Sequence, residues 1–119
     1  MKRIYATVIA VMALGIYIIS CSKSGGSSSN FSVDCSTVTN KAFTADINPI
    51  IQSRCNVISC HASGSSNGPG PLTNYSEVFS ARSSIRTAIA NGTMPQGSSL
   101  TTAQKNSIVC WIDSGAPNN

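Results

Sequence analysis

The sequence is poor in charged and aromatic side chains, and it contains one histidine, His61. Charged residues make up 10% of the chain and aromatic residues 6%. Proteins that bind nucleic acid usually present a clustered basic surface, often with aromatic residues interleaved. Removal of Lys2 and Arg3 with an N-terminal leader would lower the net charge from +4 to +2, with the remaining basic residues scattered along the chain. The composition therefore gives no support for nucleic-acid binding.

Long apolar runs are also scarce, and the clearest one lies at the N-terminus. Two basic residues precede the uncharged apolar segment 4–19, which is the layout of a secretory leader. This segment is shorter than the ~20 apolar residues that cross a bilayer comfortably, which disfavours the alternative of a transmembrane anchor. It ends in Ile-Ile-Ser-Cys21, which resembles a bacterial lipobox. The resemblance implies a signal peptide over residues 1–20 and acylation of the Cys21 thiol.

The rest of the chain divides into a tether and one small domain. Residues 21–42 are rich in Ser and Gly after Cys21 and cannot bury a core, so we expect a flexible extension. The folded domain is expected over residues 43–119. Domains of this size often need a disulfide, a metal or a cofactor, because their buried apolar area barely exceeds the entropy cost of ordering the chain.

The first of three short helices is expected just after Thr44, which we interpret as its N-cap. Ile47, Ile50 and Ile51 have the i, i+3, i+4 spacing of a buried helix face. Pro49 is compatible with this helix only in its first turn, where no backbone N–H is needed.

The other two helices are expected over residues 75–91 and from Thr101 to about Gly115. In the earlier one, apolar residues recur on one side, and a break near Ser83-Ser84 is an open alternative. In the later one, Thr101 and Gln104 have the spacing of a capping box. Ile108, Trp111 and Ile112 are its predicted buried residues. The Gly-, Ser- and Pro-rich stretch 62–74 is predicted to be a loop.

The most informative segment contains Cys55, Cys60 and His61. Covalent haem attachment needs two thiols that add to the porphyrin vinyl groups and a histidine beside the second thiol. The usual motif has two residues between its cysteines, whereas this sequence has four. The two additional residues must therefore loop outward for both sulfur atoms to reach the same ring. The alternative is an ordinary histidine beside a structural disulfide.

A second iron ligand is suggested by Met94, the only methionine that remains after the leader is removed. A thioether opposite histidine raises the reduction potential of a haem. Met94 stands between Gly-Thr and Pro95 in an expected loop, which favours a ligand. The alternative is a flexible core residue, as most methionines are.

In the order of these parts, the sequence resembles the small monohaem cytochrome c family over roughly residues 43–117. The resemblance implies an all-α, cytochrome c-like bundle of about three helices around one haem, with long irregular loops. It implies one covalent haem c, with His61 as the proximal and Met94 as the distal iron ligand. It also implies that Pro95 stiffens the ligand loop and that Trp111 shapes the pocket, although ordinary core packing is an equal alternative for Trp111.

Two cysteines remain, Cys35 and Cys110. Disulfides persist outside the cytoplasm, and an even remainder of cysteines suggests that these two are paired. Such a bond would connect the N-terminal extension to the last helix.

Together these features predict a monomeric, lipid-anchored one-electron carrier in the cell envelope, facing the periplasm. It would exchange electrons with redox partner proteins and have no substrate chemistry of its own. One alternative is a disulfide-stapled binding or structural lipoprotein without haem. A zinc site or a thiol-disulfide enzyme is disfavoured, because zinc would need a fourth ligand and no Cys-x-x-Cys pair is present.

Overall fold

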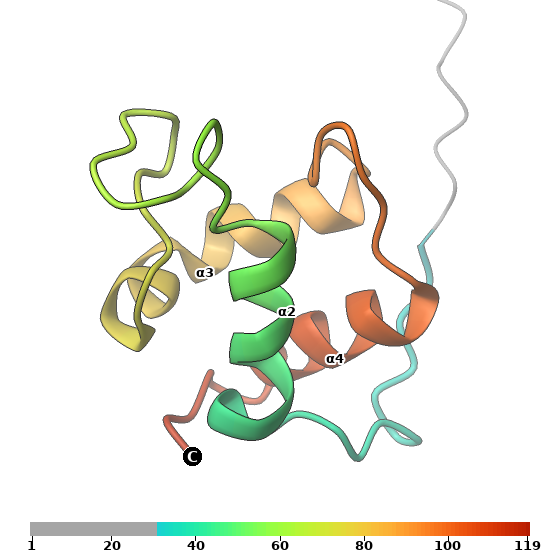
Figure 1. Ribbon diagram of the computed structural model, residues 1–119. Helices are drawn as coiled ribbons and strands as arrows, with labels where there is room; N and C mark the ends of the chain where they lie inside the picture. The colour runs from blue at the N-terminus through green and yellow to red at the C-terminus, as the bar shows by residue number, and fades with distance from the viewer. Residues whose placement is uncertain (1–30) are drawn as a thin grey trace, which may run out of the picture.

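The computed structural model describes residues 31–119. The predicted signal peptide, the predicted lipidation site Cys21 and the first part of the tether lie outside the described residues. The helical elements are η1 (Phe43–Ile47), α2 (Asn48–Arg54), α3 (Tyr75–Ala90) and α4 (Thr102–Asp113), and the described part of the chain has no strand (Figure 1). None of these helices is long and apolar enough to cross a membrane. The expected all-α architecture with three α-helices is confirmed.

The first helical segment begins at Phe43, so the prediction that Thr44 is its N-cap is wrong. The Asp46 carboxylate instead accepts a hydrogen bond from the backbone N–H of Ala42. The backbone N–H groups of Phe43 and Thr44 donate to Asn119 at the end of the chain. These contacts satisfy donors that a cap would otherwise serve. The π-helical turn η1 continues directly into α2, which has Pro49 in its first turn as predicted.

Helices α3 and α4 begin with side-chain caps. The Asn74 side chain accepts from the N–H of Glu77 at the start of α3. Thr101 and Gln104 form the predicted capping box at the start of α4. Helix α3 runs without the break considered at Ser83-Ser84. Both serines are exposed there, so they interrupt no buried face.

The hydrophobic core lies where η1 and α2 meet α3 and α4. Trp111 of α4 is fully buried, and its ring centroid lies 5.4 Å from that of Phe43. Its indole N–H donates to the carbonyl of Pro117 (2.9 Å), so the buried polar group is satisfied. Ile47, Ile51 and Ile108 are also fully buried. The packing of η1 against α4 therefore defines the side of the domain that we call the core side.

A disulfide joins Cys35 to Cys110, as the cysteine count predicted, with 5.5 Å between the two Cα atoms. Cys110 lies on α4 and is 1% exposed. The bond connects residues 75 positions apart and ties the N-terminal extension to the core side.

Candidate functional site

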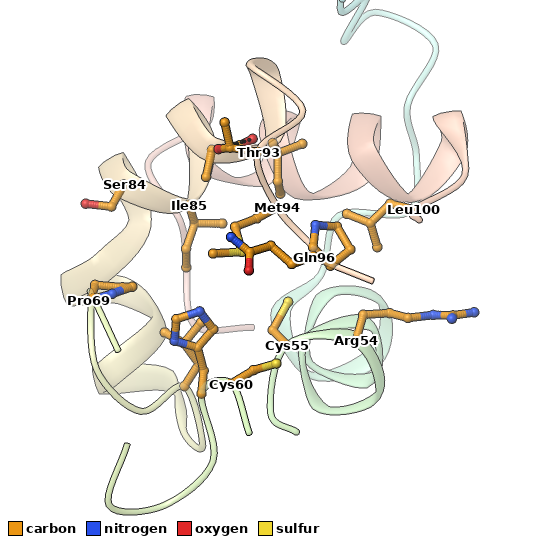
Figure 2. Close-up of a pocket in the computed structure, with 16 residues that line it drawn as sticks. Arg54, Cys55, Cys60, Pro69, Ser84, Ile85, Thr93, Met94, Gln96 and Leu100 are labelled. Atoms are coloured by element: carbon orange, nitrogen blue, oxygen red, sulfur yellow. Dashed lines mark hydrogen bonds between the residues drawn. The ribbon is translucent and has the colours of Figure 1, made fainter. Parts of the chain in front are cut away.

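A cavity of about 380 Å³ lies between the loop after α2, helix α3 and the loop before α4 (Figure 2). This volume falls within the range of about 300–1,000 Å³ that is usual for small-molecule and cofactor sites. The lining residues are Arg54, Cys55, Cys60, His61, Gly68, Pro69, Leu72, Ser84, Ile85, Ala88, Ile89, Thr93, Met94, Pro95, Gln96 and Leu100. Most are apolar, and only Arg54 has a permanently charged side chain.

The cavity brings together most of the predicted site residues. Cys55, Cys60, His61, Met94 and Pro95 all line it. In Figure 2, Cys55 and Cys60 lie close together beside α2, whereas Met94 comes from the loop after α3. Two thiols and two possible iron ligands from separate parts of the chain thus face one apolar space.

Trp111 is not among the residues that line the cavity. It lies in the core, packed against Phe43 and hydrogen-bonded to Pro117. This position agrees with the packing alternative for Trp111 and not with the pocket role that the resemblance implied.

The loop from Cys55 to His61 is closed by backbone hydrogen bonds. The N–H of Cys55 still donates to Ile51 at the end of α2 (2.9 Å), and the N–H of His61 donates to the carbonyl of Cys55 (3.2 Å). The second bond holds the two ends of the loop together. Val57 and Ile58 project outward between them, with Ile58 95% exposed. The four-residue spacing is therefore accommodated by an outward loop whose ends remain adjacent.

His61 is buried, and one of its ring nitrogens is fixed by the backbone. The residue is only 6% exposed, and its Nδ1 lies 2.8 Å from the carbonyl oxygen of Gly70. A carbonyl oxygen only accepts hydrogen bonds, so Nδ1 carries the proton and donates it. In the neutral ring, Nε2 then keeps its lone pair, which is the state that a metal ligand requires.

Gly70 is a site residue that sequence analysis missed, having assigned its segment only to a loop. Its φ of +99° lies in a region that L side chains rarely adopt. The loop also returns to His61 through Leu72, whose N–H donates to the carbonyl of His61 (2.8 Å). The Gly-Pro pattern around Gly70 was the available signal, but it does not reveal which group its carbonyl would bind.

Gln52 is a second residue that sequence analysis missed. Its amide oxygen accepts a hydrogen bond from the Asn56 side chain, at the start of the exposed loop. Its amide nitrogen donates to the carbonyl oxygen of Leu72 (3.3 Å). One side chain on α2 thus connects both segments that flank His61. The i, i+4 spacing of Gln52 and Asn56 was visible in the sequence, but the long-range contact was not.

Met94 is positioned by the end of α3. The N–H groups of Thr93 and Met94 both point to the carbonyl of Ala88, at 2.9 and 3.4 Å. Gly92 supplies the turn with a φ of +68°. Met94 is half-buried, and Ile85 and Ile89 of α3 form the adjacent apolar wall. The loop therefore leaves the helix with Met94 directed to the cavity.

The two thiols at the cavity are not joined to each other, and both are half-buried. Burial, together with the smaller effect of the neighbouring Cys60, raises the pKa of the Cys55 thiol to about 11. Cys55 is therefore protonated at neutral pH. Thiol-disulfide exchange proceeds through a thiolate, so this environment disfavours the thiol-disulfide enzyme alternative.

Within residues 31–119, no group of three or more His, Cys, Asp and Glu side chains is arranged to hold a metal ion. A haem iron needs fewer protein ligands, because the porphyrin supplies the other four. The donor set at the cavity, one imidazole with a free Nε2, one thioether and two thiols, fits a covalently bound haem. Comparisons of the chain with protein-family models, curated proteins and solved structures find no match.

Proposed function

We propose that this protein is a c-type cytochrome that carries one electron at a time on a single covalent haem. The observation that carries the proposal is the shared cavity. It is lined by the only histidine of the chain, the only methionine beyond the leader, and the two cysteines of residues 31–119 that lie outside the disulfide. Four residues selected from sequence alone therefore face the same apolar space.

In this proposal each residue has a distinct task. Cys55 and Cys60 would hold the haem through thioether bonds, and His61 and Met94 would be the protein ligands of its iron. The Gly70 carbonyl keeps the His61 ring in the tautomer that leaves Nε2 free. The bound haem supplies the one-electron chemistry of its iron. Ile85 and Ile89 exclude water, which together with a thioether ligand favours the reduced form.

In this proposal the protein is an electron carrier and not an enzyme. If His61 and Met94 both held the iron, no coordination position would be left open for a substrate. Electrons would pass to and from redox partner proteins, with the chain acting as a monomer. The proposed location is the cell envelope, facing the periplasm, with the protein held at the membrane by a lipid on Cys21. The Cys35–Cys110 disulfide is compatible with that oxidising environment.

The proposal is tested by producing the full chain in a host with a cytochrome c maturation system. We expect a coloured protein whose Soret absorbance survives acid-acetone extraction, because thioether bonds resist it. Intact mass should show one haem, the acyl chains and one disulfide. His61→Ala should remove the low-spin spectrum, whereas Lys41→Ala should not. A colourless wild-type protein from a host that matures a control cytochrome would overturn the proposal.

A disulfide-stapled binding lipoprotein without haem is the second candidate. Two observations favour it: the disulfide is formed away from the cavity, and the cavity is lined mainly by apolar side chains. Such a site would take an uncharged apolar ligand. This candidate predicts a colourless protein in the same experiment, with Cys55 and Cys60 still free for alkylation.

A further inference from the structure

Val57 and Ile58 are the exposed large hydrophobic residues in the described part of the chain, at 44% and 95% exposure. A single exposed isoleucine is common on protein surfaces. These two are adjacent, however, and occupy the outward loop between Cys55 and Cys60. Thioether bonds to those cysteines would bring the edge of a bound haem beside this loop. The pair therefore lies beside the two thiols to which the proposed haem would be bonded.

The surroundings of Val57 and Ile58, which form the tip of this loop, carry little charge. The segments 55–76 and 87–104, which contain the loops framing the cavity and the adjoining helix ends, contain no Asp, Glu, Lys or Arg. Arg54 is the only permanently charged residue at the cavity. Another cation, Arg86, is paired with Asp113. A partner approaching this face would meet apolar and neutral polar groups, with one arginine at the margin.

We propose that Val57 and Ile58 form a docking surface for a redox protein whose own contact face is apolar and uncharged. This inference rests on the proposed function, because it requires a haem bonded to Cys55 and Cys60. A neutral face lacks the charges that would attract an oppositely charged partner. The partner face that matches it best is therefore also neutral. Burial of the Ile58 side chain would then supply the attraction. The additional residues between the cysteines acquire a function as the contact point.

The test uses the holoprotein and gold electrodes coated with alkanethiol monolayers that imitate three kinds of partner. Mixed methyl and hydroxyl termini represent an uncharged apolar face, carboxylate termini an acidic face and amine termini a basic face. We expect the fastest interfacial electron transfer on the mixed monolayer. The rate there should change less than about twofold as the Debye length is reduced from ~30 to ~3 Å with salt.

Two variants at one position isolate the apolar contact. Ile58→Ser should lower the electroactive population on the mixed monolayer by about tenfold, because one apolar side chain is lost from the contact. Ile58→Leu is the matched control and should retain the wild-type population. The absorption spectrum and the reduction potential should be unchanged in both variants. Each variant carries the same N-terminal segment, so any anchoring through a lipid is common to all.

Several outcomes would overturn the inference. Equal populations for wild type and Ile58→Ser, or faster transfer on either charged monolayer, would contradict an apolar docking face. A loss of binding to phosphatidylcholine vesicles with unchanged electron transfer on the mixed monolayer would identify the tip as a lipid contact instead. Absence of covalent haem in the wild-type protein is a separate result, which overturns the proposed function itself.

Discussion

The core side of the domain and the cavity side are held together by different kinds of contact. On the core side, Trp111 is fully buried against Phe43, and a disulfide fixes α4 to the N-terminal extension. On the cavity side, two irregular loops are held mainly by backbone hydrogen bonds, such as His61 to Cys55. Apolar side chains there face an open space, so they contribute less packing than residues in the core.

This difference separates stability from function. Side chains on the core side contact one another, so their removal should change the free energy of unfolding. Side chains on the cavity side point to the candidate site, so their removal should change the binding or the properties of the proposed haem. The two sides meet along α2, which carries Ile51 in the core and ends at Arg54, just before Cys55. Substitutions on each side should therefore give distinct signatures.

Truncation of the core tryptophan should have the largest effect. Trp111→Ala removes a fully buried indole and leaves Pro117 without its donor, so we expect a loss of about 3–5 kcal/mol in the free energy of unfolding. This is a large part of the ~5–15 kcal/mol typical of a folded domain. Urea unfolding of the holoprotein, followed by far-UV circular dichroism, measures it. Trp111→Phe is the control and should lose less. A loss below about 1 kcal/mol for Trp111→Ala would contradict the assigned core role.

Removal of the disulfide should have the next largest effect. The double variant Cys35→Ser, Cys110→Ser releases a loop of 75 residues, for which the chain-entropy model gives on the order of 4 kcal/mol. The same urea titration measures the loss, and the haem spectrum of the folded variant should match that of wild type. Wild-type stability in the double variant would show that the bond contributes little. Two free thiols at positions 35 and 110 in the native protein would contradict its presence.

Replacement of the proposed distal ligand should have the opposite signature, with a small loss of stability and a large change in the properties of the haem. Met94→Ala removes a half-buried side chain, so the loss in stability should be smaller than for Trp111→Ala. The reduction potential should fall by on the order of 0.1 V, because the thioether that favours reduced iron is lost. Redox titration followed by absorbance measures the change. Thr93→Ala, in the same loop, is the matched control. An unchanged potential and spectrum in Met94→Ala would rule out histidine-methionine ligation even with haem bound.

Local patterns in the sequence were enough to predict most of the fold. Thr101 and Gln104 cap α4 as their spacing predicts, and Pro49 lies in the first turn of α2. The start of the first helix was misplaced at Thr44, because its N–H is satisfied by Asn119. That contact joins residues from the two ends of the domain. No local pattern reports it, so the true boundary could not be read from the sequence.

The candidate site also divides into residues that the sequence predicted and contacts that it did not. Chemistry and spacing selected Cys55, Cys60, His61 and Met94 from the sequence. In the structure, all four line one cavity. The Gly70 carbonyl that orients His61 was not predicted, because every residue has a carbonyl and only the folded loop determines which one faces the ring. The sequence also left two roles possible for Trp111, in the pocket or in the core, for a related reason. A helix face predicts that a side chain is buried, but not which neighbours surround it.

The smallest effect is expected at the surface pair between α3 and α4. Arg86 Nε lies 2.6 Å from an Asp113 carboxylate oxygen, with the two side chains 45% and 38% exposed. The hydrogen bond from Arg86 lowers the pKa of Asp113 below its ordinary value of 3.8. Because exposed pairs are screened by solvent, Asp113→Asn should cost only about 0.2–1 kcal/mol at neutral pH.

The direction of the pKa shift fixes the pH dependence of that small contribution. Asp113 binds its proton less readily in the folded chain than in the unfolded chain. The pair therefore stabilises the fold above pH 3.8, and this stabilisation is lost as the pH falls through the lowered pKa. Unfolding of wild type and Asp113→Asn should differ at pH 7 and converge in acid, with the neutral-pH difference reduced by salt. A difference that grows in acid would contradict the pairing, and so would one that exceeds the Trp111→Ala effect, since stability would then depend more on the surface than on the core side.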